Sequence, residues 1–109
     1  MNPALLLASR LSALILAVAV AVHLAVIIHA VRNGLTASAL LARTEGNWAF
    51  LIFYCIFVLA AAVHAPIGLR LVLSEWFGWE GRLADRLLVA FAILLAALGL
   101  RAALAVFLA

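Results

Sequence analysis

The chain contains few of the residues that a water-soluble domain needs on its surface. Only 10% of its 109 residues are charged, lysine is absent, and 72% are hydrophobic. Soluble globular chains are about half apolar and about a quarter charged. A water-soluble domain of this size is therefore excluded, and a membrane protein is indicated.

Cysteine is also scarce, because Cys55 is the only one. One cysteine excludes an intrachain disulfide and leaves the redox compartment open. Repeats, low-complexity tracts and interdomain linkers are absent. With so little chain outside the apolar segments, we expect no catalytic domain. The formal net charge of +3 comes from scattered arginines. This pattern is typical of anchoring to anionic lipid and carries no nucleic-acid signature.

Long apolar stretches dominate the sequence, at about residues 4–31, 48–73 and 87–108. Each exceeds the ~20 residues that cross a bilayer core. The first is longer than the core of a secretory signal and has no clear cleavage site, so we expect it to be retained. The sequence predicts one all-α transmembrane domain over residues 1–109, with three spanning helices. A polar connection between the first two helices is expected to contain an interfacial turn around residues 36–42.

The arginines predict how the chain is oriented. The N-terminal side of the predicted helices carries four of them: Arg10, Arg70, Arg82 and Arg86. The opposite side carries three: Arg32, Arg43 and Arg101. Positive charge favours the cytoplasmic side, so we expect a cytoplasmic N-terminus.

His64 is the main candidate for chemistry. It lies within the second apolar stretch, and an ionisable side chain at membrane depth is by default a functional candidate. Gly68 follows one helical turn later on the same face and leaves room for a large planar ligand. Axial ligation of heme is one interpretation. A hydrogen bond from His64 to a neighbouring helix is the other.

Polar residues near the start of the first helix form a second candidate group: Ser9, Arg10 and Ser12. They belong to the same side of the membrane as His64 and Arg70. Buried donors there would suit heme propionates or a quinone carbonyl, because guanidinium pairs strongly with carboxylates. The alternative is an arginine that reaches toward lipid headgroups and serines that bond within their own helix.

His23 is predicted in the other half of the membrane, on the same helix face as Ser12. Eleven residues, close to three helical turns, separate the two. Two interpretations of His23 are open. It ligates a second, distal heme, or it packs against a neighbouring helix.

These residues together resemble the cytochrome b556 membrane-anchor family of succinate dehydrogenase, the small C-type subunit of respiratory complex II. The matching elements are Ser9-Arg10-Leu11-Ser12 and His64-x-x-x-Gly68-x-Arg70, with the acidic Glu75 after it. The resemblance covers residues 5–108. The second motif is the more specific of the two.

The resemblance implies a subunit of a larger heme-binding helical bundle. A second hydrophobic anchor subunit would share one heme b, and an iron–sulfur subunit and an FAD flavoprotein would dock on the cytoplasmic or matrix face. His64 would ligate the heme iron, Arg10 would serve a propionate or the quinone, and Ser12 would belong to the quinone site. Ubiquinone and menaquinone are equally compatible. We expect the bacterial inner membrane rather than the mitochondrial one.

Three positions depart from the family pattern. Leu6 and Ser9 replace a serine and a histidine that many members have, and Leu71 replaces a further histidine. His23 resembles instead a ligand of anchors that hold two hemes. The sequence is also compatible with an anchor for a fumarate-reductase-type relative or for another heme b dehydrogenase. A small helical transporter or assembly protein is a further alternative.

Overall fold

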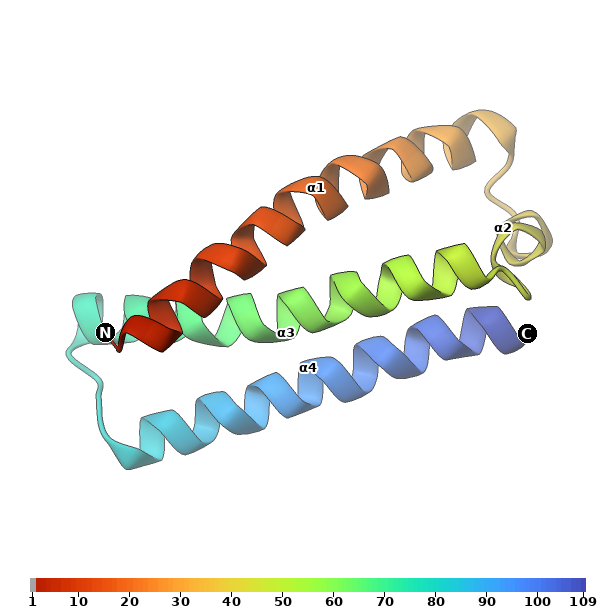
Figure 1. Ribbon diagram of the computed structural model, residues 1–109. Coiled ribbons are helices and arrows are strands. Elements are labelled where there is room, and N and C mark those ends of the chain that lie inside the picture. The colour runs from red at the N-terminus through yellow and green to blue at the C-terminus, as the bar shows by residue number, and fades with distance from the viewer. Residues whose placement is uncertain (1) are drawn as a thin grey trace.

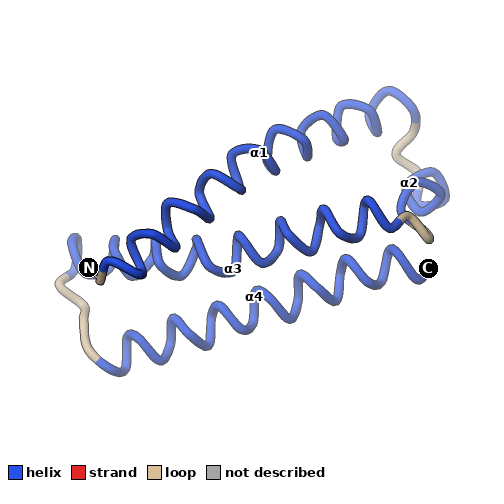
Figure 2. The backbone as a smooth tube through the Cα atoms, in the orientation of Figure 1, coloured by secondary structure: helices blue, strands red, loops and turns tan. Residues whose placement is uncertain are grey.

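The computed structural model describes residues 2–109, which form four helices (Figure 1). They are α1 (Pro3–Asn33), α2 (Ala37–Thr44), α3 (Trp48–Phe77) and α4 (Arg82–Leu108). No strand occurs in this part of the chain (Figure 2). Helix α3 lies between α1 and α4, packs against both and runs antiparallel to each (Figure 1).

Three of the helices, α1, α3 and α4, are long and apolar enough to cross a membrane. The longest dimension of the molecule is 47 Å, which exceeds the ~30 Å hydrocarbon core of a bilayer. The prediction of an all-helical protein with three helices of membrane-spanning length is confirmed.

The helices extend beyond the apolar stretches that predicted them. Helix α3 continues about one turn past residue 73 and ends at Phe77. The next residue, Gly78, has a φ of 62°, the left-handed conformation common after helices. Helix α4 begins at Arg82, five residues before the predicted start at 87, directly after Gly81. Asp85 lies in its first turn, where a carboxylate interacts favourably with the helix dipole. The apolar pattern marks the lipid-facing part of a helix and misses its polar ends.

The connection predicted as a turn forms the short helix α2. The Thr36 hydroxyl caps its start by accepting a hydrogen bond of 3.2 Å from the Ala39 backbone N–H. In Figure 1, α2 lies across the direction of the long helices. The Thr44 hydroxyl donates to the Val106 carbonyl at 3.0 Å, which ties this connection to the end of α4.

Small residues make the helix contacts. Almost all buried apolar residues are alanines, namely Ala19, Ala30, Ala60, Ala62, Ala84 and Ala103. Small side chains let helix backbones approach closely in a membrane. Helices α3 and α4 approach each other closely at Gly99, where an added Cβ would overlap the γ-carbons of Val58.

The outer surface is strongly apolar. No large side chain among the described residues is fully buried, and Leu14, Val18 and Ile93 are each about two-thirds exposed. Three helices are too few to enclose side chains of this size. This surface requires lipid or further helices around it.

Candidate functional site

His64 on α3 faces α1 and contacts Ser12. Its Nδ1 lies 3.4 Å from the Ser12 hydroxyl oxygen, which makes this a long hydrogen bond. Ser12 is 5% exposed and is the buried polar residue of the helix contacts. The α1 contact face repeats every three to four residues, so Ser12, Ala19 and His23 all point toward α3.

The hydrogen bonds of Ser12 favour one tautomer of His64. The Ser12 hydroxyl has one proton to donate, and the Ser9 backbone carbonyl at 3.0 Å is the nearer of its two partners. With that proton on the carbonyl, the hydroxyl accepts from His64, and Nδ1 carries the hydrogen. In the neutral ring this leaves the lone pair on Nε2.

The Nε2 atom of His64 is available to a ligand. It has no hydrogen-bond partner among the described residues, and none of their buried side-chain nitrogens or oxygens lacks a partner. It is therefore accessible. A histidine held through Nδ1 with an accessible Nε2 is the usual arrangement of a metal-ligating imidazole.

Gly68 has open space beside it. A Cβ added at this position would meet nothing within 4 Å, so α1 and α4 do not fill this side of α3. Pro66 is buried within the same helix, which remains continuous although the ring removes one backbone hydrogen bond. The face of α3 that carries His64 and Gly68 therefore has room for a further group beside Gly68.

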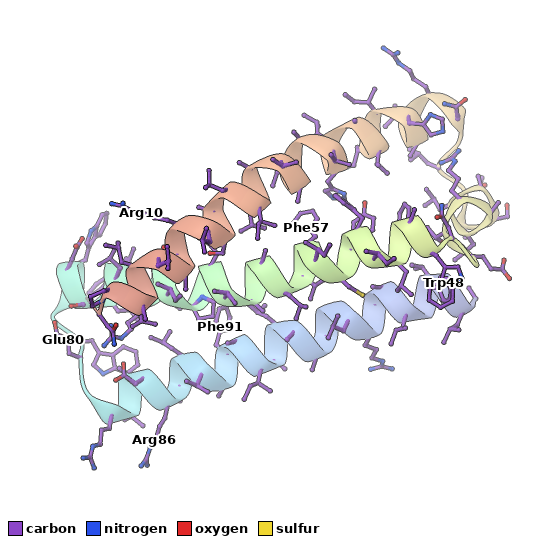
Figure 3. The ribbon with its side chains drawn as sticks, in the orientation of Figure 1. Arg10, Trp48, Phe57, Glu80, Arg86 and Phe91 are labelled. Carbon is purple, nitrogen blue, oxygen red and sulfur yellow. The ribbon has the colours of Figure 1, made fainter. Side chains whose placement is uncertain are left out.

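Arg10 is not part of the His64 contact. It is exposed, and its side chain extends outward from α1, away from α3 (Figure 3). Ser9 contributes its backbone carbonyl to Ser12. Hydrogen bonds therefore connect Ser9, Ser12 and His64, whereas the Arg10 side chain points away from the other helices.

His23 forms a second polar contact between α1 and α3. Its Nδ1 lies 2.8 Å from the Tyr54 hydroxyl oxygen, and its ring packs edge-to-face against Tyr54 and Phe57. Phe57 lies between the two helices in Figure 3. His23 thus packs between the helices, and its Nε2, like that of His64, takes no part in the contact.

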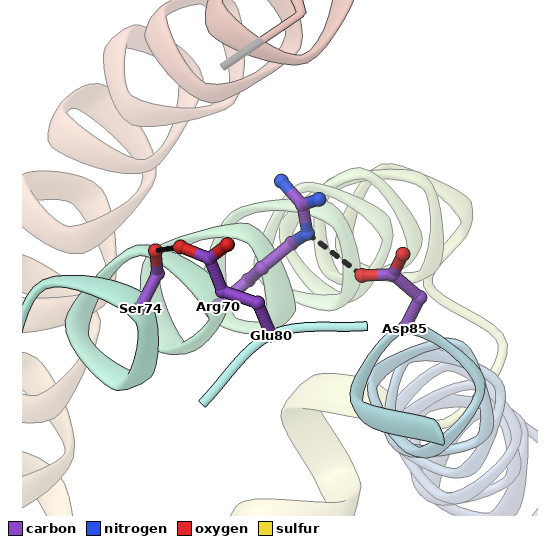
Figure 4. Close-up of polar contacts among 4 residues, drawn as sticks. All are labelled: Arg70, Ser74, Glu80 and Asp85. Carbon is purple, nitrogen blue, oxygen red and sulfur yellow. Dashed lines mark hydrogen bonds and ion pairs between the residues drawn. The ribbon is translucent and has the colours of Figure 1, made fainter. Parts of the chain in front are cut away.

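Arg70 forms an ion pair with α4 near the end of the molecule that carries the N-terminus. Its Nε donates to Asp85 Oδ1 at 2.9 Å (Figure 4). Close by, the Ser74 hydroxyl donates to a Glu80 carboxylate oxygen. Both contacts connect α3 with the segment that follows it.

Sequence reasoning missed two of these partners, Tyr54 and Asp85. Tyr54 gives no local signal, because its partner lies 31 residues away. The register of the antiparallel helices α1 and α3 does indicate that Tyr54 lies opposite His23. From Ser12 to His23 is eleven residues, and from His64 back to Tyr54 is ten, as antiparallel helices require. Asp85 lies just before the apolar stretch at 87–108, and the apolar pattern predicts no partner for it.

The described part of the chain offers no cluster of side chains for a bare metal ion. Among residues 2–109, no three histidine, cysteine, aspartate or glutamate side chains gather where they could hold one. A porphyrin differs because it brings four nitrogen ligands of its own and needs protein only at the axial positions. A single accessible imidazole is compatible with that requirement.

Comparisons of the chain with protein-family models, with curated proteins and with solved structures give no match.

Proposed function

We propose that this protein is a membrane-anchor subunit of a succinate:quinone oxidoreductase, or of a fumarate-reductase-type relative, that binds heme b and quinone. The observation that carries the proposal is His64, held through Nδ1 by Ser12 with Nε2 accessible. The motif resemblance over residues 9–12 and 64–75 supplies the class of complex.

A heme would use His64 as one axial ligand. Gly68 leaves open space beside α3, which favours a large flat group at this level of the helix. A partner anchor subunit would supply the second ligand on the other side. The heme would provide a one-electron redox centre with a potential set by its ligands and their hydrogen bonds.

Within this scheme, the residues of this chain would position the heme and tune its redox potential. Ser12 would hold the imidazole of His64 in one orientation, as the hydrogen-bond partners of ligating histidines do. Its one proton goes to the Ser9 carbonyl, which leaves no donor for a quinone carbonyl, so we assign Ser12 to His64 rather than to quinone. Arg10 faces outward and is free to pair with a propionate or with a group of a partner subunit.

The exposed apolar surface supports assembly with other subunits. A second hydrophobic anchor would cover part of it, and lipid would cover the rest. The end that carries Arg70, Arg82 and Arg86 would face the cytoplasm and receive the iron–sulfur and flavoprotein subunits. Succinate oxidation would occur in the flavoprotein, and electrons would reach quinone at the membrane face.

A second candidate function is favoured by the same contact. A histidine that bonds to a serine on another helix is also what helix packing alone produces. In that case the chain is a small transporter or an assembly protein, and His64 links α1 to α3. An anchor for a different heme b dehydrogenase would share every feature of the main proposal.

Purification of the complex from native membranes tests the class. The tagged chain should co-purify with a flavoprotein, an iron–sulfur protein and a second hydrophobic subunit, each identified by mass. A flavoprotein with covalent or bound FAD and succinate-dependent dye reduction would support the main proposal. Isolation of the chain with none of these subunits would contradict it.

A further inference from the structure

One charged residue of α4 lies well inside the apolar part of the chain. Arg101 belongs to the apolar stretch at 87–108 and precedes Phe107 by six residues. The Phe107 ring packs against Trp48 at the start of α3, with ring centroids 4.7 Å apart. Tryptophan concentrates at the membrane–water interface. With α4 across a bilayer, Arg101 therefore lies about 9 Å inside that interface.

Arg101 points away from the rest of the molecule. Gly99, which makes the close contact with Val58 on α3, is two residues earlier, and two residues turn a helix by about 200°. The Arg101 side chain is exposed. In the described part of the chain, the arginine hydrogen bonds and the ion pair involve Arg43 and Arg70 instead. A charge at this depth is costly without a counter-charge, and such charges usually face a protein partner.

Lipid head groups on the nearer side are badly placed for this guanidinium. Side chains of an α-helix lean toward the helix N-terminus. The N-terminal end of α4 lies at the far end of the molecule from its C-terminus (Figure 1), so the Arg101 side chain leans toward the middle of the bilayer. Arg10 shows the reverse arrangement. It lies near the start of α1, where the same lean carries it outward to head groups.

Arg70 shows how this chain compensates an arginine with the same lean. It lies in the C-terminal half of α3, where its side chain also leans toward the apolar middle of the helix. Asp85 Oδ1 accepts from its Nε at 2.9 Å. A carboxylate on a neighbouring helix is therefore the partner that we expect for Arg101.

The chain does not supply that carboxylate at this depth, even from a second copy. Its four acidic residues all lie outside the apolar stretches. They are Glu45, Glu75, Glu80 and Asp85. In a dimer through this face of α4, each Arg101 would also oppose its own copy, and like charges repel. The missing carboxylate must come from a different protein.

The helix face around Arg101 suits close contact with another helix. Ala97 and Ala105 lie one turn before and one turn after it on the same face, and both are exposed. Alanines also make most of the helix contacts within the molecule. Small side chains let two helix backbones approach closely in a membrane. A carboxylate on the partner then comes within reach of the guanidinium.

We propose that this face of α4 docks a transmembrane helix of a different protein, and that an aspartate or glutamate of that helix pairs with Arg101 within the membrane. The proposal rests on the proposed function for the presence of a second membrane subunit. It adds the face of contact and the chemistry of the partner, and it requires neither heme nor quinone.

Carbodiimide cross-linking tests for the carboxylate directly. Lysine is absent from the chain, so Arg101→Lys introduces its only lysine side chain and keeps the charge. Native membranes with the tagged variant are treated with dicyclohexylcarbodiimide, which partitions into lipid and couples an amine to an adjacent carboxylate. We expect a cross-linked product whose amide bond maps by mass to an aspartate or glutamate in an apolar segment of another membrane protein. The parent, which lacks the amine at this position, should give none.

Further variants check the position and the strength of the contact. Arg32→Lys places a lysine at the exposed end of α1 and should not join the mapped carboxylate. Arg101→Leu removes the charge and should weaken retention of the partner in detergent by about tenfold or more. Exchange of the two charges, with Arg101→Glu and an arginine at the mapped position, should restore retention. If Arg101→Lys does not accumulate in membranes, photo-reactive benzoylphenylalanine in place of Ala105 maps the contact instead.

Three results would overturn the proposal. They are no cross-link to a membrane helix from either position, a product with a lipid such as phosphatidylserine, and a product between two copies of this chain through Glu45. The second would assign the face to lipid, and the third to a dimer. Subunit masses are read from the same preparation. A cross-linked helix without a flavoprotein and an iron–sulfur protein would refute the proposed function alone, and those subunits without a cross-linked helix would refute this inference alone.

Discussion

The His64 Nδ1 atom lies 3.4 Å from the Ser12 hydroxyl, which itself donates to the Ser9 carbonyl. This chain of hydrogen bonds connects α1 with α3 and favours the tautomer of His64 that has its lone pair on Nε2. A residue predicted for the quinone site thus supports the predicted heme ligand.

Ser12→Ala tests that support. The variant leaves the His64 Nδ1–H without its acceptor, and interhelical hydrogen bonds in membranes are worth about 0.6 kcal/mol on average. We expect a small loss of stability together with a shifted heme midpoint potential, measured by redox titration. Ser9→Ala is the matched control, because it keeps the backbone carbonyl that Ser12 uses. Equal potentials in Ser12→Ala and the parent would contradict the role of Ser12.

Gly99→Ala tests the packing of α3 on α4. The new methyl group would overlap Val58, and overpacking of a close contact costs about 1–3 kcal/mol. Unfolding in mixed detergent micelles measures the change. Adding Val58→Ala should recover part of the loss, whereas Ala102→Val on the exposed face of α4 should have little effect. No recovery in the double variant would show that the cost arises elsewhere.

His23→Leu tests whether the chain holds a second heme. His23 has a packing role through Tyr54 and the aromatic rings around it, so we expect one heme per flavin in both parent and variant. His23→Leu should lower stability more than Tyr54→Phe, because it removes the edge-to-face ring contacts as well as the shared hydrogen bond. Two hemes per flavin that fall to one in His23→Leu would establish the distal heme instead.

The fold was predictable from the sequence because apolar length alone specifies helices in a bilayer. The ends of the helices were less predictable. Arg82 and Asp85 are polar and lie outside any apolar run, although they belong to the first turn of α4. Helix α2 was also missed, since an eight-residue helix depends on its Thr36 cap and its contact with Val106.

The candidate site was predictable in part. His64 stands out as an ionisable residue in an apolar segment, and helical periodicity places His23 on the Ser12 face. The contacts across helices did not follow from local spacing. Arg70 belongs to the motif that begins at His64, but its pairing with Asp85 required the register of α3 and α4. Whether these residues hold heme or quinone remains a prediction.

The reduced-minus-oxidised optical spectrum of the purified complex tests the central claim most directly. The parent and His29→Ala should both show a b-type heme band, because His29 is exposed and bonds only to Asn33 on its own helix. His64→Ala should lose the band or become high-spin. A parent without a b-type band, or a His64→Ala spectrum and heme content equal to the parent's, would contradict the assignment of His64 as a heme ligand.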